Sequence, residues 1–190
     1  MPPKQKITKD LLLEHAFQIA KEQGIMAVTS RSVAKSADCS IQPVFSQFPT
    51  MEELRKATFE YACSKLMQEI LEYQDSPDFI NRTNIWLLNF ARNEPKLFEL
   101  LYLSDSFHSA NLWDTMMEWE SNQKMMSAVE QKYGLTQEEC KDIFLRGFFM
   151  LFGIAALIAK GKIEVSNEEA VDMVQRTFMQ MADSGKGERI

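Results

Sequence analysis

The chain has 190 residues, of which 45% are hydrophobic and 25% charged, and its formal net charge is −6. This composition excludes general disorder and allows one core, or one core with a small satellite domain. Seven glycines and six prolines are too few for the many turns of a β-sandwich. The composition therefore favours an all-α protein.

The sequence gives little support for a membrane span, a disulfide framework or a metal site. The longest apolar run, 147–159, is shorter than the about 20 residues that a membrane span needs. The first ten residues have no apolar signal-peptide core, so we expect a cytoplasmic protein with no membrane partner. Cys39, Cys63 and Cys140 lie far apart and the two histidines are isolated. We therefore expect no metal and no cofactor, and interpret these residues as packing or surface residues.

Helical spacing of apolar residues, together with capping signals, predicts about nine helices and no strand. The first three helices run over 8–23, over a short segment that Thr29 caps and that ends near 36, and over a short segment that Ser40 caps. The remaining predicted helices cover 50–74, 76–93, 95–103, 112–133, 137–160 and 167–182. Between the second and third helices the chain must turn sharply at Asp38, a residue type that tolerates a left-handed backbone.

Charge divides unevenly between the two ends of the chain. Residues 1–48 carry six Lys/Arg against four Asp/Glu, a net charge of +2, which leaves 15 against 23, a net charge of −8, for the remainder. A weakly basic N-terminal unit on an acidic body is typical of a small polyanion-binding head on a larger domain.

The second and third helices are too short to be stable alone and must pack on the first. A short third helix after a tight turn suits the major groove, where Gln42 can hydrogen bond to a base edge. The other candidate contacts are hydroxyls, amides, apolar groups and one arginine: Thr29, Ser30, Arg31, Ser40, Ile41, Pro43, Phe45, Ser46 and Gln47. From spacing alone, an α-helical hairpin with solvated polar positions is an equally good interpretation.

Residues 8–54 resemble, without a gap, the DNA-binding region of the TetR family of transcriptional regulators. The matching segments are "LLEHAFQIAKEQG", "AVTSRSVAKSA" and "CSIQPVFSQFPTMEEL". The sequence departs from the family's usual residues at Asp38, Phe45, Gln47 and Met51, where Gly, Tyr, His and Lys are usual. The last three of these positions typically touch the phosphate backbone.

The resemblance implies a helix-turn-helix DNA-binding domain over 1–50 and a helical regulatory domain over 51–190, with C-terminal helices for dimerisation. It also implies double-stranded DNA with a pseudo-palindromic operator, a homodimer and a small-molecule effector as partners. The segment 143–159 is apolar almost all round, more than one subunit's core can use, which favours the homodimer.

The expected effector is small and apolar or amphipathic, because the middle of the chain is rich in aromatic residues and methionine. Candidate ligand-binding residues are Trp86, Phe90, Trp113, Met117, Phe144, Arg146 and Phe148. For Arg146, an intersubunit salt bridge is an equally good interpretation.

The function predicted is that of a ligand-responsive transcription regulator, and the family implies a repressor released from its operator. An enzyme is not expected, since the sequence has no Ser/His/Asp set, glycine-rich phosphate loop or metal cluster. The alternative is an all-α protein-interaction module whose helix-turn-helix no longer binds DNA.

Overall fold

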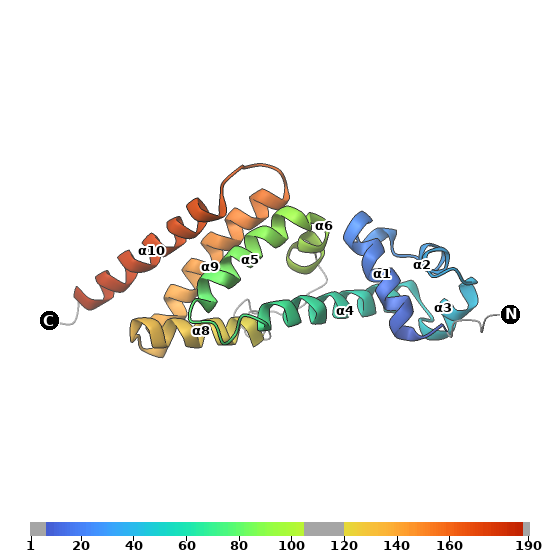
Figure 1. Cartoon of the computed structure of the whole chain (residues 1–190), viewed down its shortest axis with the longest axis horizontal. Helices are drawn as coiled ribbons and strands as arrows, with labels where there is room; N and C mark the ends of the chain where they lie inside the picture. The colour runs from blue at the N-terminus through green and yellow to red at the C-terminus, as the bar shows by residue number, and fades with distance from the viewer. Residues whose placement is uncertain (1–6, 105–119, 188–190) are drawn as a thin grey trace. The chain divides into compact units, whose positions relative to one another are not determined.

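The computed structural model describes residues 7–104 and 120–187 (Figure 1). In these residues the chain forms nine α-helices and no strand, so the predicted all-α fold is confirmed. The α-helices are α1 (Lys9–Gln23), α2 (Ser30–Ser36), α3 (Ile41–Gln47), α4 (Met51–Leu71), α5 (Phe79–Asn93), α6 (Pro95–Phe98), α8 (Glu120–Tyr133), α9 (Gln137–Ala159) and α10 (Asn167–Gly187). A 3₁₀ turn, η1 (Ile25–Ala27), follows α1, and one π-helical segment, η2 (Glu99–Leu103), follows α6.

Several helices begin where capping side chains predict. The Thr29 hydroxyl accepts from the backbone N–H of Ser32, whose own side chain accepts from the Thr29 backbone, a reciprocal box. Thr136 and Glu139 form the same box at α9. Ser166 and Glu169 repeat it at α10. The sequence predicts the boxes at α9 and α10, because each involves residues only three apart with Glu at the third position, whereas at α2 it predicts only the Thr29 cap.

Other boundaries differ from the predicted ones. Ser40 is the N-cap residue of α3, as predicted, and has an extended backbone, but its side chain makes no capping hydrogen bond. The long helix α4 ends at Leu71, and α5 begins at Phe79 after a turn in which the Ser76 hydroxyl accepts from the Asp78 N–H. At the C-terminal end α10 continues past 182 to Gly187.

Contacts divide the chain into two compact units. The first combines Met1–Leu66 with Lys96–Ser106, and the second combines Met67–Pro95 with Phe107–Ile190. The helix α4 therefore contributes to both units. The division does not coincide with the predicted domain boundary at residue 50.

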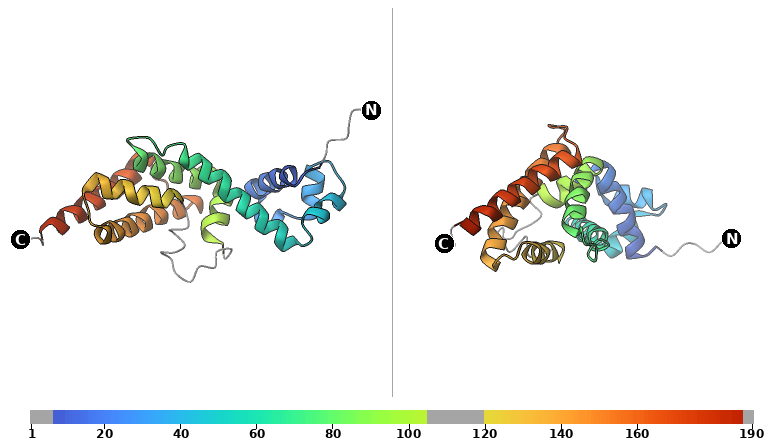
Figure 2. Two further views of the ribbon diagram at one scale, coloured as in Figure 1. Left: turned by 90° about the horizontal axis from the view of Figure 1, so that it is seen from below. Right: turned by 60° about the vertical axis from the view of Figure 1, so that its left-hand side comes forward.

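In the first unit, α1 packs against α2 and η1, and α2 packs against α3 (Figure 2). Leu12, Ala16, Val33, Val44 and Leu54 are among the fully or almost fully buried residues of this core. We call α1, α2 and α3 the head. The turn between α2 and α3 has Asp38 at φ 48°, which confirms the left-handed backbone predicted there.

In the second unit, α9 packs against α5, α8 and α10 (Figure 1). One side of α9 supplies buried residues at helical spacing, namely Ile143, Gly147, Leu151, Ala155 and Ile158. The other side remains accessible, since Phe149 is 48% exposed and Leu157 46% exposed.

By length and composition, α9 is also a helix that could cross a membrane, the one such helix in residues 7–104 and 120–187. Only 33% of its most apolar window is buried within the chain. Core helices of soluble proteins satisfy the same length and composition criteria.

Candidate nucleic-acid interface

The outer face of α3 lies in solvent. Val44 points inward and is fully buried, while Phe48, directly after the helix, is 2% exposed. On the opposite side Gln42, Ser46 and Gln47 are exposed, and Ile41 and Phe45 are each 47% exposed. An α-helix with its side chains is about 10–12 Å in diameter, which matches a major groove about 12 Å wide. The structure thus presents a continuous surface from residues predicted to meet DNA.

The predicted contacts at the start of α2 have different surroundings. Arg31 is exposed. The Thr29 hydroxyl is engaged in the capping box and also donates to Ser32 Oγ at 3.0 Å. Ser30 is 5% exposed and its hydroxyl lies 3.7 Å from the sulfur of Met51, to which it donates. A phosphate contact through the Ser30 hydroxyl therefore does not fit this structure.

The remaining predicted positions flank α3. Ser40 is exposed at its N-terminal end, and Pro43 is half-buried in its first turn. The Ser46 hydroxyl donates to the Pro43 carbonyl oxygen at 2.9 Å. Its oxygen retains lone pairs that can accept, so this intrahelical bond leaves Ser46 able to meet a donor.

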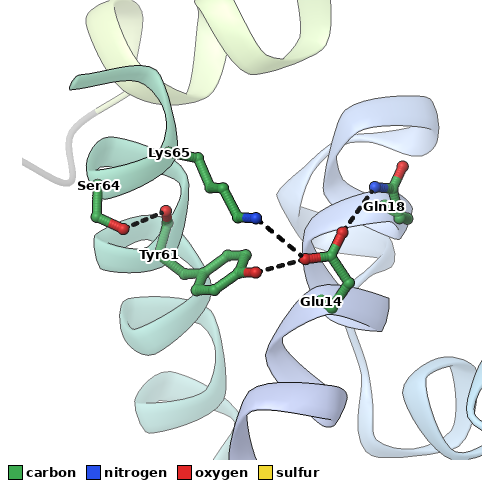
Figure 3. Close-up of polar contacts among 5 residues, drawn as sticks. All are labelled: Glu14, Gln18, Tyr61, Ser64 and Lys65. Atoms are coloured by element: carbon green, nitrogen blue, oxygen red, sulfur yellow. Dashed lines mark hydrogen bonds and ion pairs between the residues drawn. The ribbon is translucent and has the colours of Figure 1, made fainter. Parts of the chain in front are cut away.

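A polar cluster joins the head to α4 (Figure 3). The Glu14 carboxylate of α1 accepts a short hydrogen bond from the Tyr61 hydroxyl of α4 and lies 3.6 Å from the Lys65 ammonium. Its other oxygen accepts from the Gln18 amide at 3.1 Å. The ring of Phe17 packs edge-on against Tyr61, with 5.8 Å between the centroids. The cluster therefore links α1 of the head to α4.

Protonation equilibria in this cluster follow from its hydrogen bonds. Donation by Tyr61, then by Gln18, holds the pKa of Glu14 below its ordinary value. Partial burial and the bond to Glu14 raise the pKa of Tyr61. The Tyr61 hydroxyl, followed by the charges of Tyr61 and Glu14, raises the pKa of Lys65. Near neutral pH the cluster therefore contains a carboxylate, a neutral phenol and an ammonium.

Further side chains join α1, α2 and α4, and the sequence analysis did not identify them. Arg55 of α4 donates from Nε to the Val28 carbonyl at 3.3 Å, just before α2. His15 Nδ1 lies 2.9 Å from the Ser36 hydroxyl, which connects α1 with the end of α2. No sequence signal could have paired residues 21 or more positions apart, because such contacts depend on how the helices pack.

Two of the three cysteines have thiols of low reactivity. Burial raises the pKa of the Cys63 thiol to about 12 and raises that of Cys140 as well. Both thiols are therefore protonated and poorly nucleophilic near neutral pH. This matches the packing role expected for them. Among the described residues no group of three or more His, Cys, Asp or Glu side chains could hold a metal ion.

The predicted ligand-binding residues fall into two aromatic pairs on helices that pack together. On α5, Trp86 stacks on Phe90 with 5.2 Å between ring centroids, and the indole N–H donates to Glu69 at 3.2 Å. On α9, Phe144 stacks on Phe148 with 6.3 Å between centroids. Phe90 and Phe144 are buried, whereas Trp86 and Phe148 are half-buried.

Arg146 does not join these aromatic residues. It lies on the surface of α9 and pairs with Asp142 one turn earlier, with 2.9 Å between Nε and the carboxylate. Trp113 and Met117, the other two predicted ligand-binding residues, lie outside the described residues. Arg146 therefore forms an ion pair within its own helix.

A surface hollow of about 850 Å³ lies elsewhere in the second unit, between the α4–α5 connection and α8. Polar residue types outnumber apolar ones around it and include Gln74, Asp75, Asp78, Gln123 and Lys124. Of the predicted ligand-binding residues, the five that the structure describes do not line it. Lys124 donates to the Gln74 amide oxygen across it.

Comparison with solved structures identifies the fold. A TetR-like transcriptional regulator from Rhodococcus sp. RHA1 superimposes with a TM-score of 0.62 over 90% of this chain and 93% of its own, at 15% sequence identity. A TetR transcriptional regulator from the same organism has a TM-score of 0.49 over the same shares, at 20% identity. No protein-family model matches the sequence, and no curated protein does either.

The described residues form an all-α protein whose head contains a helix-turn-helix, α2 and α3. Its fold is that of the TetR-like regulators, as the resemblance of residues 8–54 predicts, and the likeness extends over 90% of the chain.

Proposed function

We propose that this protein is a DNA-binding transcription regulator whose head docks α3 in the major groove. The observation that carries the proposal is the exposed outer face of α3 in a head that shares its fold with TetR-like regulators. The helix α2, which packs against α3, exposes Arg31 and Lys35, whose positive charge suits backbone contacts to DNA. A regulator of this kind acts in the cytoplasm and needs no catalytic residue.

Binding of the purified protein to the DNA upstream of its own gene tests the proposal. The titration runs between about 50 and 200 mM salt beside an unrelated duplex of equal length. We expect selective binding that weakens steeply with salt, because phosphate contacts release counterions. Weak binding that is equal on both duplexes, and on duplexes from a random pool, would contradict the proposal and favour the protein-interaction module.

Two substitutions separate base contacts from backbone contacts. Gln42→Ala removes a group on the outer face of α3 and should relax base preference by about 1–3 kcal/mol at one position. Arg31→Ala should weaken binding to all sequences alike and lower the salt slope by about one. Matched controls are Gln23→Ala at the exposed end of α1 and Arg82→Ala on α5, which should leave DNA binding unchanged.

We further propose that the protein is a homodimer joined through α9 and α10. Large apolar side chains on these helices are exposed in the single chain, with Phe149 48%, Leu157 46%, Met173 40% and Met179 60% exposed. Gly153 has no described atom within 4 Å of where a Cβ would lie, so another helix could approach closely there. A symmetric dimer would place two copies of α3 in successive major grooves, about 34 Å apart, on a pseudo-palindromic operator.

Control by a small apolar or amphipathic effector completes the proposal. The stacked pairs Trp86–Phe90 and Phe144–Phe148 lie on α5 and α9, which pack against each other. An effector acts by binding better to a state whose two α3 helices no longer match the operator. The assay is release of the operator complex by candidate ligands, repeated with Phe148→Ala. A ligand that releases both proteins at the same concentration would place its site elsewhere.

A further inference from the structure

The exposed face of α3 is uncharged and partly apolar. Its sequence, "IQPVFSQ", contains no acidic and no basic residue. Ile41 and Phe45 are one turn apart, so they lie about 40° apart around the helix. Gln42 lies about 60° beyond Phe45 on the same exposed side. The three residues form one surface, which we call the α3 patch.

This composition limits which bases α3 can read. Guanine is read mainly by Arg or Lys and cytosine by Asp or Glu, and α3 has none of these four residue types. Glutamine pairs with the N6 and N7 atoms of adenine, and apolar side chains contact the 5-methyl group of thymine. The side chains of the α3 patch therefore match the two bases of an A·T pair.

The apolar side chains also need a covering surface. Two large side chains, each 47% exposed, leave apolar area in water that a partner could remove at a gain of about 25 cal/mol per Å². The neighbouring helix α2 exposes the cations Arg31 and Lys35 and has no acid. An apolar strip on a helix that packs against a cationic helix suits a groove whose floor has methyl groups and whose rims are phosphates.

We propose that the α3 patch reads A·T pairs, with Ile41 and Phe45 against thymine methyl groups and Gln42 on the adjoining adenine. The inference rests on the proposed DNA binding and specifies its sequence chemistry. Phe45 then has a direct role in specificity, one that its lack of a hydroxyl favours, because the whole ring edge is apolar. The base pairs under the centre of α3 are A·T pairs in each half-site.

The probe is a DNA duplex that the protein selects from a pool. Each duplex of the pool contains a randomised stretch of about 20 base pairs, or two helical turns. Each thymine of the selected duplex is then replaced by deoxyuridine, which lacks only the 5-methyl group. We expect affinity to fall about fourfold at each contacted thymine, the value of one buried methyl-sized group. At other thymines the replacement should have no effect.

A variant of the protein shows which thymine Phe45 contacts. In Phe45→Ala, deoxyuridine at the position Phe45 contacts should no longer weaken binding, whereas the other contacted thymine should keep its effect. The matched control is Met26→Ala, since Met26 is 72% exposed and lies in η1 outside α3. This variant should retain the full wild-type pattern.

The outcomes distinguish the inference from the proposed function. Tight, selective binding with no deoxyuridine effect at any position, or with G·C pairs under α3, would overturn the inference and leave DNA binding intact. Failure to enrich any duplex would overturn both, and the α3 patch would then be a contact for another protein. Because deoxyuridine alters only the DNA, the test does not depend on any variant folding.

Discussion

The ring of Phe178 on α10 occupies the space beside Gly147 of α9 where a Cβ atom would lie. Absence of a side chain at residue 147 therefore lets the two helices meet. Since Val171 and Val174 are also buried along α10, this contact belongs to the core of the second unit.

Replacing Gly147 with Ala should destabilise the protein by about 1–2 kcal/mol, because relief of the overlap moves the Phe178 ring off α9. Alanine's higher helix propensity, worth about 1 kcal/mol, offsets only part of this loss. Thermal unfolding measures the effect as a fall in Tm of a few degrees. The double variant Gly147→Ala with Phe178→Leu should recover part of the loss, and additive effects would refute the contact.

Gly153→Leu tests the dimer without challenging the fold of the single chain. Because no described atom outside the nearby backbone of α9 lies within 4 Å of a Cβ at 153, we expect a leucine to be accepted in each subunit and to obstruct a second copy. We expect the molecular mass from analytical ultracentrifugation to fall toward that of one chain, with helical content by circular dichroism retained. An unchanged dimer mass would exclude the strip around Gly153 from the interface.

Stability of the head should depend on pH through the Glu14 cluster. Since hydrogen bonds lower the pKa of Glu14 from its ordinary value of 4.5, its contribution is present above that value and is lost as the pH falls through the lower, folded pKa. Tyr61→Phe removes the leading cause. This substitution should lower the free energy of unfolding by about 1 kcal/mol or less at neutral pH. It should also make that free energy less dependent on pH in the acid range, the acid limb, as measured by urea unfolding.

The same cluster predicts that the free energy of unfolding also falls in the alkaline range, the alkaline limb. The pKa values of Tyr61 and Lys65 are both raised, so their contribution is present below the ordinary values, about 10, and is lost as the pH rises through the folded ones. Tyr61→Phe should reduce this limb too. Gln68→Ala, at an exposed position of the same helix without a titratable group, serves as a control that leaves both limbs in place.

Asp38 offers a test of backbone strain. At φ 48° a side chain pays a steric penalty that glycine does not. Asp38→Gly should therefore leave stability unchanged or raise it by up to about 1 kcal/mol, whereas the β-branched Asp38→Val should lower it by about 1–2 kcal/mol. A decrease for glycine as large as that for valine would show that the Asp38 side chain, and not its backbone, matters.

The sequence by itself determined the features that depend on neighbours a few residues apart. Examples are the capping boxes Thr136–Glu139 and Ser166–Glu169, the left-handed turn at Asp38 and the spacing of apolar residues along α9. Each depends on residues that lie within one or two helical turns of one another. Such local interactions persist whatever the rest of the chain does, so the all-α fold and most helix positions could be predicted.

Only the tertiary structure decided which side chains those helices bury, pair or expose. Ser30 was a candidate for a phosphate contact, but packing of α2 against α4 buries it beside Met51. Arg146 was a candidate for a ligand, but the packing of α9 leaves it in solvent beside Asp142. Glu14 and Tyr61 are 47 residues apart, and Gly147 and Phe178 lie on different helices. Their meeting depends on the rotation and spacing of packed helices, which the helical pattern of a single sequence leaves free.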